Sequence, residues 1–332
     1  MAKTGIILAN TGTPDSPAPE DVRRYLEQFL SNPRIVPMNK RAWWLILHLF
    51  ILPSRKNSSS EKYKTIWTDE GFAFIRDHMA LARAVQHAYD ASEIDVSVEC
   101  AMSFGNPSIE NVMRHLRDIG CEKLIVLPLY PQNAFSQASI VADAVELHAL
   151  STGWQDAYEL IGDYSDNETY LAAIADSIQA AGFDTGRDRL LMSFHSIPRT
   201  DVEQGDTYGA NVRSTCLDIA RKLGLDSESW AQAFQSRFDK GRAWLGPFTG
   251  EVLQKWAKEE LDGRLFVACP NFSVDCLETY YDIDTIMRNT WAELHQGRSD
   301  CPEFVYVPCL GASKAHVNVI MDVLKRSGAM DQ

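Results

Sequence analysis

Short apolar runs alternate along the whole chain with segments of helical length. The runs that predict strands are residues 5–9, 96–102 and 123–129 in the first half, and 157–161, 190–194, 230–234, 265–269 and 304–307 in the second. The segments that predict helices are 21–30, 107–119, 168–181, 211–223, 249–259 and 275–295. Strands that are apolar throughout, and that are separated by helices, are typical of parallel sheets buried on both faces.

Two such series of strands and helices predict an α/β fold with two doubly wound domains that face a shared cleft. We expect the first domain to cover residues 1–130 and the second to cover residues 131–332, with the last helix packing back toward the first domain. The polar run at 57–64 (NSSSEKYK) indicates a mobile linker. Ligands of such sheets bind beyond the carboxyl ends of the strands, so the residues directly after each apolar run are the functional candidates.

Charge and composition exclude several classes of function. The chain has 45 acidic and 32 basic side chains, which gives a formal net charge of −13. Nucleic-acid binding needs clustered Lys and Arg, and the sequence contains no such run, so we expect no nucleic-acid partner. The seven cysteines are scattered without a CxxC pair, and the first residues lack the layout of a signal peptide, which together predict a cytoplasmic protein. No GxGxxG or GxxxxGK[ST] loop follows a strand, which argues against a nucleotide enzyme.

Two groups of residues could carry chemistry. His195 directly follows an apolar run, where a neutral imidazole could act as a base or as a metal ligand. Asp275, Glu278 and Asp282 have the spacing i, i+3 and i+7, which places three carboxylates on one face of an α-helix. Such a face is either a solvated helix surface or, if it is buried, a site for a hydrated divalent cation.

The most apolar segment of the chain spans residues 43–52 (WWLILHLFIL). Its ten residues are about half of what crosses a bilayer, so it predicts no transmembrane helix. It is either a core helix or an exposed apolar lip. Two adjacent Trp and the flanking basic residues Lys40, Arg41, Arg55 and Lys56 suit a membrane interface or a flat apolar ligand.

Five motifs occur in an order and at a spacing that resemble the ferrochelatases. They are LANTGTPDSPAPEDVRRYLEQFLSNPRIV, LPLYPQ, SFHSIP, FQSRF followed by WLGPFT, and CPNFSVDCLETYYDI, and the resemblance runs from about residue 5 to residue 324. This resemblance implies two Rossmann-like domains with parallel sheets flanked by helices, and insertion of Fe²⁺ into a porphyrin to make haem. Fe²⁺ would be a substrate, and we expect no permanently bound cofactor.

The resemblance also implies roles for individual residues. The SFHSIP motif makes His195 the acceptor of pyrrole protons or a metal ligand, and DCLET makes Glu278 its acidic partner across the macrocycle. Asp282 falls where the family carries a second carboxylate on the metal or proton path, so His195, Glu278 and Asp282 form the expected metal set. The residues that match the porphyrin pocket are Thr11, Phe104, Tyr130, Gln132 and Trp244.

The chain departs from the family pattern mainly around this pocket. Thr11 stands where the family usually has Met, Leu or Tyr, Phe104 replaces a common Tyr, and Asn271 replaces a Gly. The alternatives to protoporphyrin IX and Fe²⁺ are therefore another tetrapyrrole (coproporphyrin or sirohydrochlorin), another metal (Co²⁺ or Ni²⁺), or a porphyrin-binding or haem-binding paralogue without turnover. Because no cysteine follows Cys309, we expect no C-terminal [2Fe–2S] cluster.

The resemblance also concerns where the protein works. The apolar lip at residues 43–52 matches a segment that touches the membrane in the family. We therefore expect the protein to be cytoplasmic and membrane-peripheral, with the lip resting on lipid or on the preceding enzyme of the pathway.

Overall fold

Two four-stranded parallel sheets organise the computed structural model, which describes residues 3–237, 239, 241–259, 261–298 and 301–330. The strands of the first sheet, in spatial order, are β4 (Val96–Met102), β1 (Thr4–Asn10), β5 (Lys123–Pro128) and β6 (Tyr158–Leu160). Those of the second sheet are β10 (Phe304–Val307), β9 (Leu265–Ala268), β7 (Arg189–His195) and β8 (Trp230–Gln235). A short antiparallel pair, β2 (Trp67–Thr68) and β3 (Gly71–Phe72), stands apart from both sheets.

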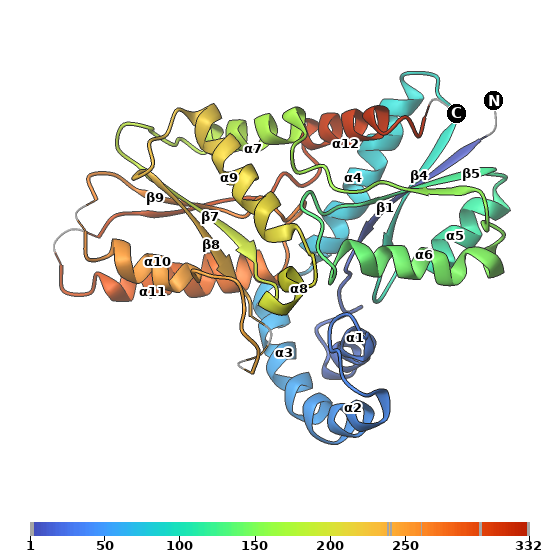
Figure 1. Cartoon of the computed structure of the whole chain (residues 1–332), viewed down its shortest axis with the longest axis horizontal. Helices are drawn as coiled ribbons and strands as arrows, with labels where there is room; N and C mark the ends of the chain where they lie inside the picture. The colour runs from blue at the N-terminus through green and yellow to red at the C-terminus, as the bar shows by residue number, and fades with distance from the viewer. Residues whose placement is uncertain (1–2, 238, 240, 260, 299–300, 331–332) are drawn as a thin grey trace. The chain divides into compact units, whose positions relative to one another are not determined.

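Helices connect the strands in the alternating order that the sequence predicts (Figure 1). In unit 1, which is defined below, they are α1 (Pro19–Ser31), α2 (Lys40–Ile46), the π-helix η1 (Leu47–Ile51), α3 (Leu52–Ile66), α4 (Ala73–Asp90), α5 (Ile109–Asp118) and α6 (Ala138–Thr152). The helices after residue 162 are α7 (Glu168–Ala180), α8 (Arg199–Glu203), α9 (Tyr208–Leu223), α10 (Thr249–Trp256), the π-helix η2 (Glu278–Met287), α11 (Arg288–Leu294) and α12 (Lys314–Arg326).

The chain divides into two compact units, each built around one sheet. Unit 1 comprises residues 1–130, 135–162 and 320–332, and unit 2 comprises residues 131–134 and 163–319. The predicted division after residue 130 is therefore wrong for residues 135–162 and for residues 320–332, which belong to unit 1. For residues 135–162 the reason is a long-range pairing: β6 runs parallel to β5, so this strand extends the first sheet, and the helix α6 before it belongs to the same unit.

The core of unit 1 forms because β1 and β5 are apolar on both faces. Ile7 and Val126 on these strands are fully buried against α5 and α6, and Leu116 and Val145 are among the helix residues that they meet. Helix α4 packs along β4 at the edge of the same sheet. Burial of this kind stabilises each large aliphatic side chain by about 1.5–3 kcal/mol.

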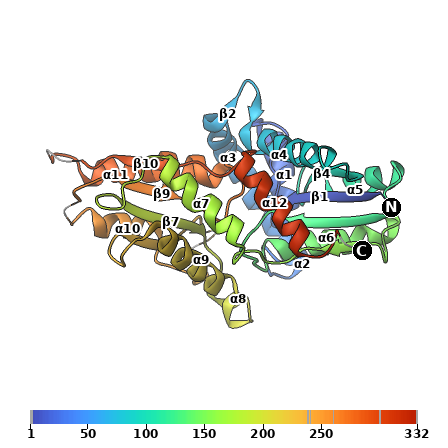
Figure 2. The same ribbon diagram turned by 90° about the horizontal axis from the view of Figure 1, so that it is seen from above.

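Unit 2 repeats this design. Its strands β7 and β9 bury Leu191 and Val267 against α10 and α11, where Leu253 and Trp291 close the core. Helices α7 and α9 pack against each other (Figure 2). The predicted fold class, with parallel sheets flanked by helices, is confirmed in both units.

Helices α1, α2 and α3 of unit 1 are grouped together (Figure 1). The prediction of a mobile linker at residues 57–64 is wrong, because this polar run lies inside α3. Two contacts hold α3 against α1 and the segment before α1: the Ser60 hydroxyl donates to the Pro17 carbonyl at 2.6 Å, and Lys56 pairs with Glu20 at 2.6 Å. Tyr63, inside the run, is buried against Phe72. The polar composition of residues 57–64 therefore fits a surface helix as well as it fits a loop.

One buried histidine makes the stability of unit 2 depend on pH. His316 on α12 is buried, and its Nδ1 donates to the Gly311 carbonyl at 2.6 Å. Burial lowers the pKa of His316 from 6.5 to about 4. The unfolded chain therefore binds one more proton than the folded chain between these pH values, and the free energy of unfolding falls as the pH falls from 6.5 toward 4.

We predict that His316 accounts for about 2 kcal/mol of the stability that the protein loses between pH 7 and pH 5. Urea unfolding at both pH values checks this, with His316→Asn as the comparison, because Asn can still donate to Gly311 but does not titrate. An equal loss in the variant and in the wild type would contradict the assignment.

Candidate active site

The predicted site residues of unit 1 meet at the carboxyl ends of β1, β4 and β5. Because β1 pairs with β5, the residues that follow them are neighbours, and the Thr11 hydroxyl lies 2.6 Å from the Tyr130 hydroxyl. The Phe104 amide donates to the Thr11 carbonyl at 2.9 Å. Gly12 has a φ of +105°, and a Cβ there would lie 1.8 Å from the Phe104 carbonyl oxygen, so only glycine permits this close approach of the two turns.

In unit 2, His195 is the last residue of β7 and is half-buried. Its Nδ1 lies 2.7 Å from the Ser196 carbonyl oxygen. A carbonyl can only accept a hydrogen bond, so Nδ1 carries a proton, and in the neutral imidazole Nε2 then carries the lone pair. The imidazole is therefore fixed in the tautomer in which Nε2 can accept a proton or bind a metal ion.

A buried tyrosine supports the backbone at His195. The Tyr208 hydroxyl donates to the His195 carbonyl at 2.7 Å and accepts from the Asn271 amide at 3.3 Å. Burial raises the pKa of Tyr208 well above its usual value, so the hydroxyl keeps its proton. Asn271, one of the departures from the family pattern, thus belongs to the hydrogen-bonded support of the histidine.

Glu278 and Asp282 lie on the wide π-helix η2 and are held by the two residues at the end of β8. The Gln235 amide donates to the Glu278 backbone carbonyl at 3.1 Å, and the Ser236 hydroxyl donates to the Asp282 carboxylate at 2.7 Å. Gln235 is also the register partner of His195 across the β7–β8 pair. Gln235 therefore connects the strand of the histidine to the helix of the two carboxylates.

Asp275 does not join the other two carboxylates, so the predicted three-carboxylate helix face is wrong. The helix begins at Glu278, and Asp275 lies before it, buried, where it accepts hydrogen bonds from the Tyr306 hydroxyl and from Thr279. In addition, η2 closes its turns with i→i+5 hydrogen bonds, so the α-helical angle used for the prediction does not apply.

Two predicted pocket residues are buried in unit 2. Gln132 is 0% exposed, and its amide donates to Tyr170 and Thr215, so its position does not support the prediction that it lines a pocket. Trp244 is 9% exposed and pairs with Pro198 in an isolated bridge, which ties it to the turn after His195. The indole Nε1 of Trp244 has no hydrogen-bond partner among the residues that the structure describes.

The described part of the chain contains no group of three His, Cys, Asp or Glu side chains arranged to hold a metal ion, so the expected metal set of His195, Glu278 and Asp282 stays a prediction. Burial raises the pKa values of the Cys269, Cys276 and Cys309 thiols well above the usual value. These cysteines are therefore thiols rather than thiolates at neutral pH and are not strong metal ligands.

A cavity of about 420 Å³ opens beside the π-helix in unit 2. Its wall includes Ser236 and Asp282, together with the charged side chains of Arg237 and Glu251. Gln235 and Ser236 directly follow the apolar run at residues 230–234, so they are among the functional candidates that the sequence predicts. No signal in the sequence pointed to Tyr208.

The fold is that of the chelatases, as the likeness to solved structures shows. SirB from Bacillus subtilis with Fe3+ matches with a TM-score of 0.59 and 12% identity, over 100% of this chain and 98% of that one. The chelatase-like protein DR2241 from Deinococcus radiodurans matches with a TM-score of 0.54 and 11% identity, over 97% of this chain and 55% of that one.

The sequence itself matches a narrower group. The family described as Ferrochelatase matches residues 3–327. The ferrochelatase of Methylococcus capsulatus is 38% identical, over 98% of this chain and 96% of that protein, and that of Haemophilus influenzae is 36% identical, over 96% of each. The ferrochelatase of Nitrosococcus oceani is 35% identical over 98% of this chain and 87% of that protein. The chain belongs to the ferrochelatase family, and it is a porphyrin metal chelatase that inserts iron for haem synthesis.

Proposed function

We propose that the substrates are Fe²⁺ and protoporphyrin IX, and that His195 and Glu278 carry the reaction. The observation that supports this most directly is the fixed tautomer of His195, which leaves Nε2 unprotonated on a strand that is coupled through Gln235 to the helix of Glu278 and Asp282. A base and two carboxylates on neighbouring elements suit a reaction that must accept protons and receive a cation.

The reaction has a simple proton balance. The porphyrin loses two pyrrole protons, and Fe²⁺ takes their place among the four ring nitrogens. His195 Nε2 accepts a pyrrole proton, and the Glu278 carboxylate serves as the acidic partner that accepts the other. Asp282 offers oxygen ligands that replace water on the incoming cation. Two or three mixed nitrogen and oxygen ligands bind the metal only transiently, which lets it pass to the macrocycle.

The choice of protoporphyrin is supported by the charge of the turns that follow Phe104 and Tyr130. Coproporphyrin carries more carboxylates, and a site for it calls for basic side chains. The turns after Phe104 and Tyr130, at residues 105–108 and 131–137, contain no Lys or Arg. A less charged porphyrin fits these turns better.

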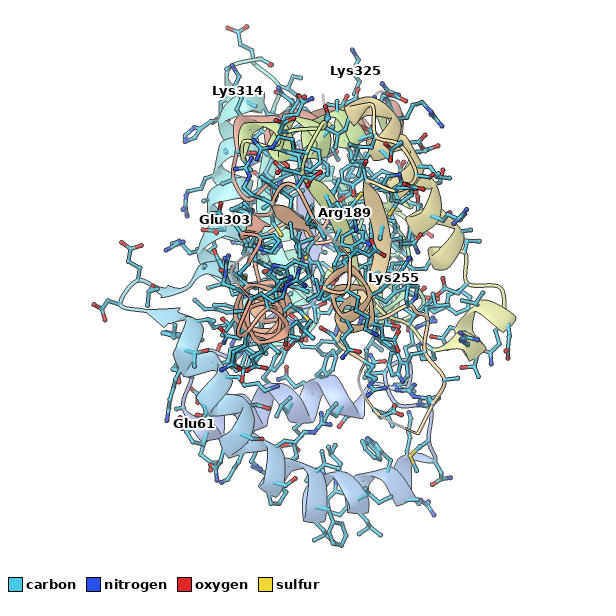
Figure 3. All side chains as sticks on the ribbon, turned by 90° about the vertical axis from the view of Figure 1, so that its left-hand side faces the viewer. Glu61, Arg189, Lys255, Glu303, Lys314 and Lys325 are labelled. Atoms are coloured by element: carbon cyan, nitrogen blue, oxygen red, sulfur yellow. The ribbon has the colours of Figure 1, made fainter. Side chains whose placement is uncertain are left out.

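We also propose that the apolar lip at residues 43–52 rests on a membrane surface. Trp44, Leu49 and Phe50 on α2 and η1 are 55%, 62% and 66% exposed, and Lys40 and Arg41 beside them are exposed as well. Side chains project outward along these helices (Figure 3). An exposed apolar surface with basic neighbours suits an anionic lipid interface. None of the helices among the described residues is long and apolar enough to cross a membrane.

We predict that His195→Ala lowers the rate of anaerobic Fe²⁺ insertion into protoporphyrin IX by about 10²–10⁴-fold, the usual contribution of one positioned base. Metallation is followed by the absorbance of the product. Wild-type turnover in the variant would remove His195 from the mechanism.

Glu278→Gln is predicted to abolish metallation while protoporphyrin binding, measured by fluorescence quenching, survives. The substitution removes the charge but keeps the backbone carbonyl that accepts from Gln235. If binding and turnover were lost together, Glu278 would have a structural role instead.

The double variant Leu49→Ser with Phe50→Ser should bind vesicles that contain anionic phosphatidylglycerol at least about tenfold more weakly than the wild type, because two large apolar side chains no longer enter the interface. The matched control is Leu147→Ser with Leu150→Ser on α6, two residues that are 74% and 72% exposed. Equal sedimentation of both double variants with the vesicles would contradict a membrane role for the lip.

A further inference from the structure

A polar side chain ends the apolar run of β1. Residues 6–9 are fully buried apolar residues, and Asn10, which follows them as the last residue of the strand, is buried as well. A buried amide costs free energy unless it is hydrogen-bonded, whereas an apolar side chain would continue the core without that cost. The partners of the Asn10 amide therefore show what this residue does.

One partner is a buried histidine of α4. His78 is 0% exposed, its Nδ1 lies 3.0 Å from the Phe74 carbonyl oxygen, and its Nε2 lies 2.9 Å from Nδ2 of Asn10. Oδ1 of Asn10 in turn accepts from the backbone amide of Thr11 at 2.7 Å. A hydrogen-bond chain thus runs from the backbone of α4, through two buried side chains, to the backbone of the turn after β1.

Only one arrangement of hydrogens satisfies this chain. The Phe74 carbonyl can only accept, so Nδ1 of His78 carries a proton, and the Thr11 amide can only donate, so the oxygen of Asn10 faces it. The Asn10 nitrogen then donates to Nε2 of His78, which holds the lone pair of a neutral imidazole. Because both ends are backbone groups with a single role, a half-turn of the Asn10 amide would break two of these hydrogen bonds.

The chain ends on a residue that is predicted to line the porphyrin pocket. Thr11 is held at each of its polar groups: its amide by Asn10, its carbonyl by the Phe104 amide at 2.9 Å, and its hydroxyl by the Tyr130 hydroxyl at 2.6 Å. Phe104 and Tyr130 are buried, whereas Thr11 is only half-buried. Thr11 is therefore the member of this group that a ligand reaches most easily, and His78 contributes to its orientation.

A second buried histidine has the same local geometry without such a chain. Nδ1 of His295, at the end of α11, lies 2.9 Å from the carbonyl oxygen of Trp291, four residues earlier, and the two rings are tilted by 54°. His78 has the same relation to Phe74, with a tilt of 53°. Within the described ranges, however, Nε2 of His295 has no hydrogen-bond partner. The contact of His78 with Asn10 is thus not a consequence of this helical geometry.

We propose that His78 is a positioning residue for porphyrin binding, which through Asn10 holds Thr11 in the orientation that the macrocycle meets. The inference rests on the proposed function, because it takes Thr11 to line the porphyrin pocket. His78 acts through Asn10 and does not itself touch the substrate. Without the acceptor on His78, the Asn10 amide is free to turn away from Thr11, and the turn must then be ordered when the porphyrin binds, which lowers the affinity.

The test compares two variants of His78 with the same two variants of His295. His78→Leu fills most of the volume of the ring and removes the acceptor, whereas His78→Gln keeps an acceptor oxygen for the Asn10 amide. His295→Leu and His295→Gln are the matched controls, because they make the same changes at a buried histidine of the same local geometry. Each protein is measured for Kd of protoporphyrin IX by fluorescence quenching, for KM of Fe²⁺ and for melting temperature.

We expect His78→Leu to raise Kd for protoporphyrin IX by about five- to tenfold, the usual effect of losing one hydrogen bond, with KM for Fe²⁺ unchanged. His78→Gln should recover part of this affinity. Both His295 variants should keep the wild-type Kd even if they lower the melting temperature.

A second measurement tests the step from His78 to Thr11. Thr11→Val removes the hydroxyl at nearly the same volume and should also raise Kd for protoporphyrin IX. If His78 acts through Thr11, the effects of His78→Leu and Thr11→Val are not additive, and the double variant binds about as weakly as the weaker single variant.

A wild-type Kd in His78→Leu, or the same rise in Kd in His78→Leu and His295→Leu, would mean that the chain is only structural and would overturn the inference. If His78→Leu does not fold, a wild-type Kd in Thr11→Val overturns it as well. Failure of the proposed function gives a different result, because the wild-type protein itself would then not insert Fe²⁺ into protoporphyrin IX.

Discussion

The parallel pairing of β7 with β8 is the interaction on which the chemistry of unit 2 depends. It places the last residue of β7, His195, directly beside Gln235, the last residue of β8. From that position Gln235 reaches the π-helix, and Ser236 reaches it one turn further along. One strand pairing therefore fixes the position of His195 relative to the helix that carries Glu278 and Asp282, and any shift of register would separate them.

This arrangement also explains how a single histidine can serve as a defined base. Two hydrogen bonds hold His195. Its Nδ1 donates to the backbone carbonyl of Ser196, and its own backbone carbonyl accepts from the Tyr208 hydroxyl. The ring is oriented by a backbone carbonyl, that of Ser196. In the proposed mechanism, Nε2 of this ring accepts the proton that the porphyrin releases.

The sequence was sufficient for the strands, for the fold class and for the position of His195, because strands that are buried on both faces are apolar throughout and their carboxyl ends are easy to locate. The assignment of residues 135–162 failed because it depends on the pairing of β6 with β5, which no local pattern reveals. The helix at residues 57–64 was missed because its support comes from contacts with residues 17 and 20, about forty positions earlier.

The carboxylates show the same limit at the site itself. The even spacing of Asp275, Glu278 and Asp282 suggested one α-helical face, yet the chain forms a π-helix whose first residue is Glu278. Gln235, the last residue of β8, and Ser236 directly after it hold that wide turn, and the left-handed conformation of Ser236 has no signature in the sequence. Resemblance to the ferrochelatases identified the two carboxylates on the helix, whereas the structure identified their supports.

The most direct measurement is an anaerobic metallation assay of the wild-type protein in which Fe²⁺ is offered with protoporphyrin IX and, separately, with coproporphyrin III. Turnover with protoporphyrin IX at a rate above that with coproporphyrin III is the predicted result, because the turns after Phe104 and Tyr130 carry no basic side chains for extra carboxylates. Turnover with coproporphyrin III alone would contradict the proposed substrate.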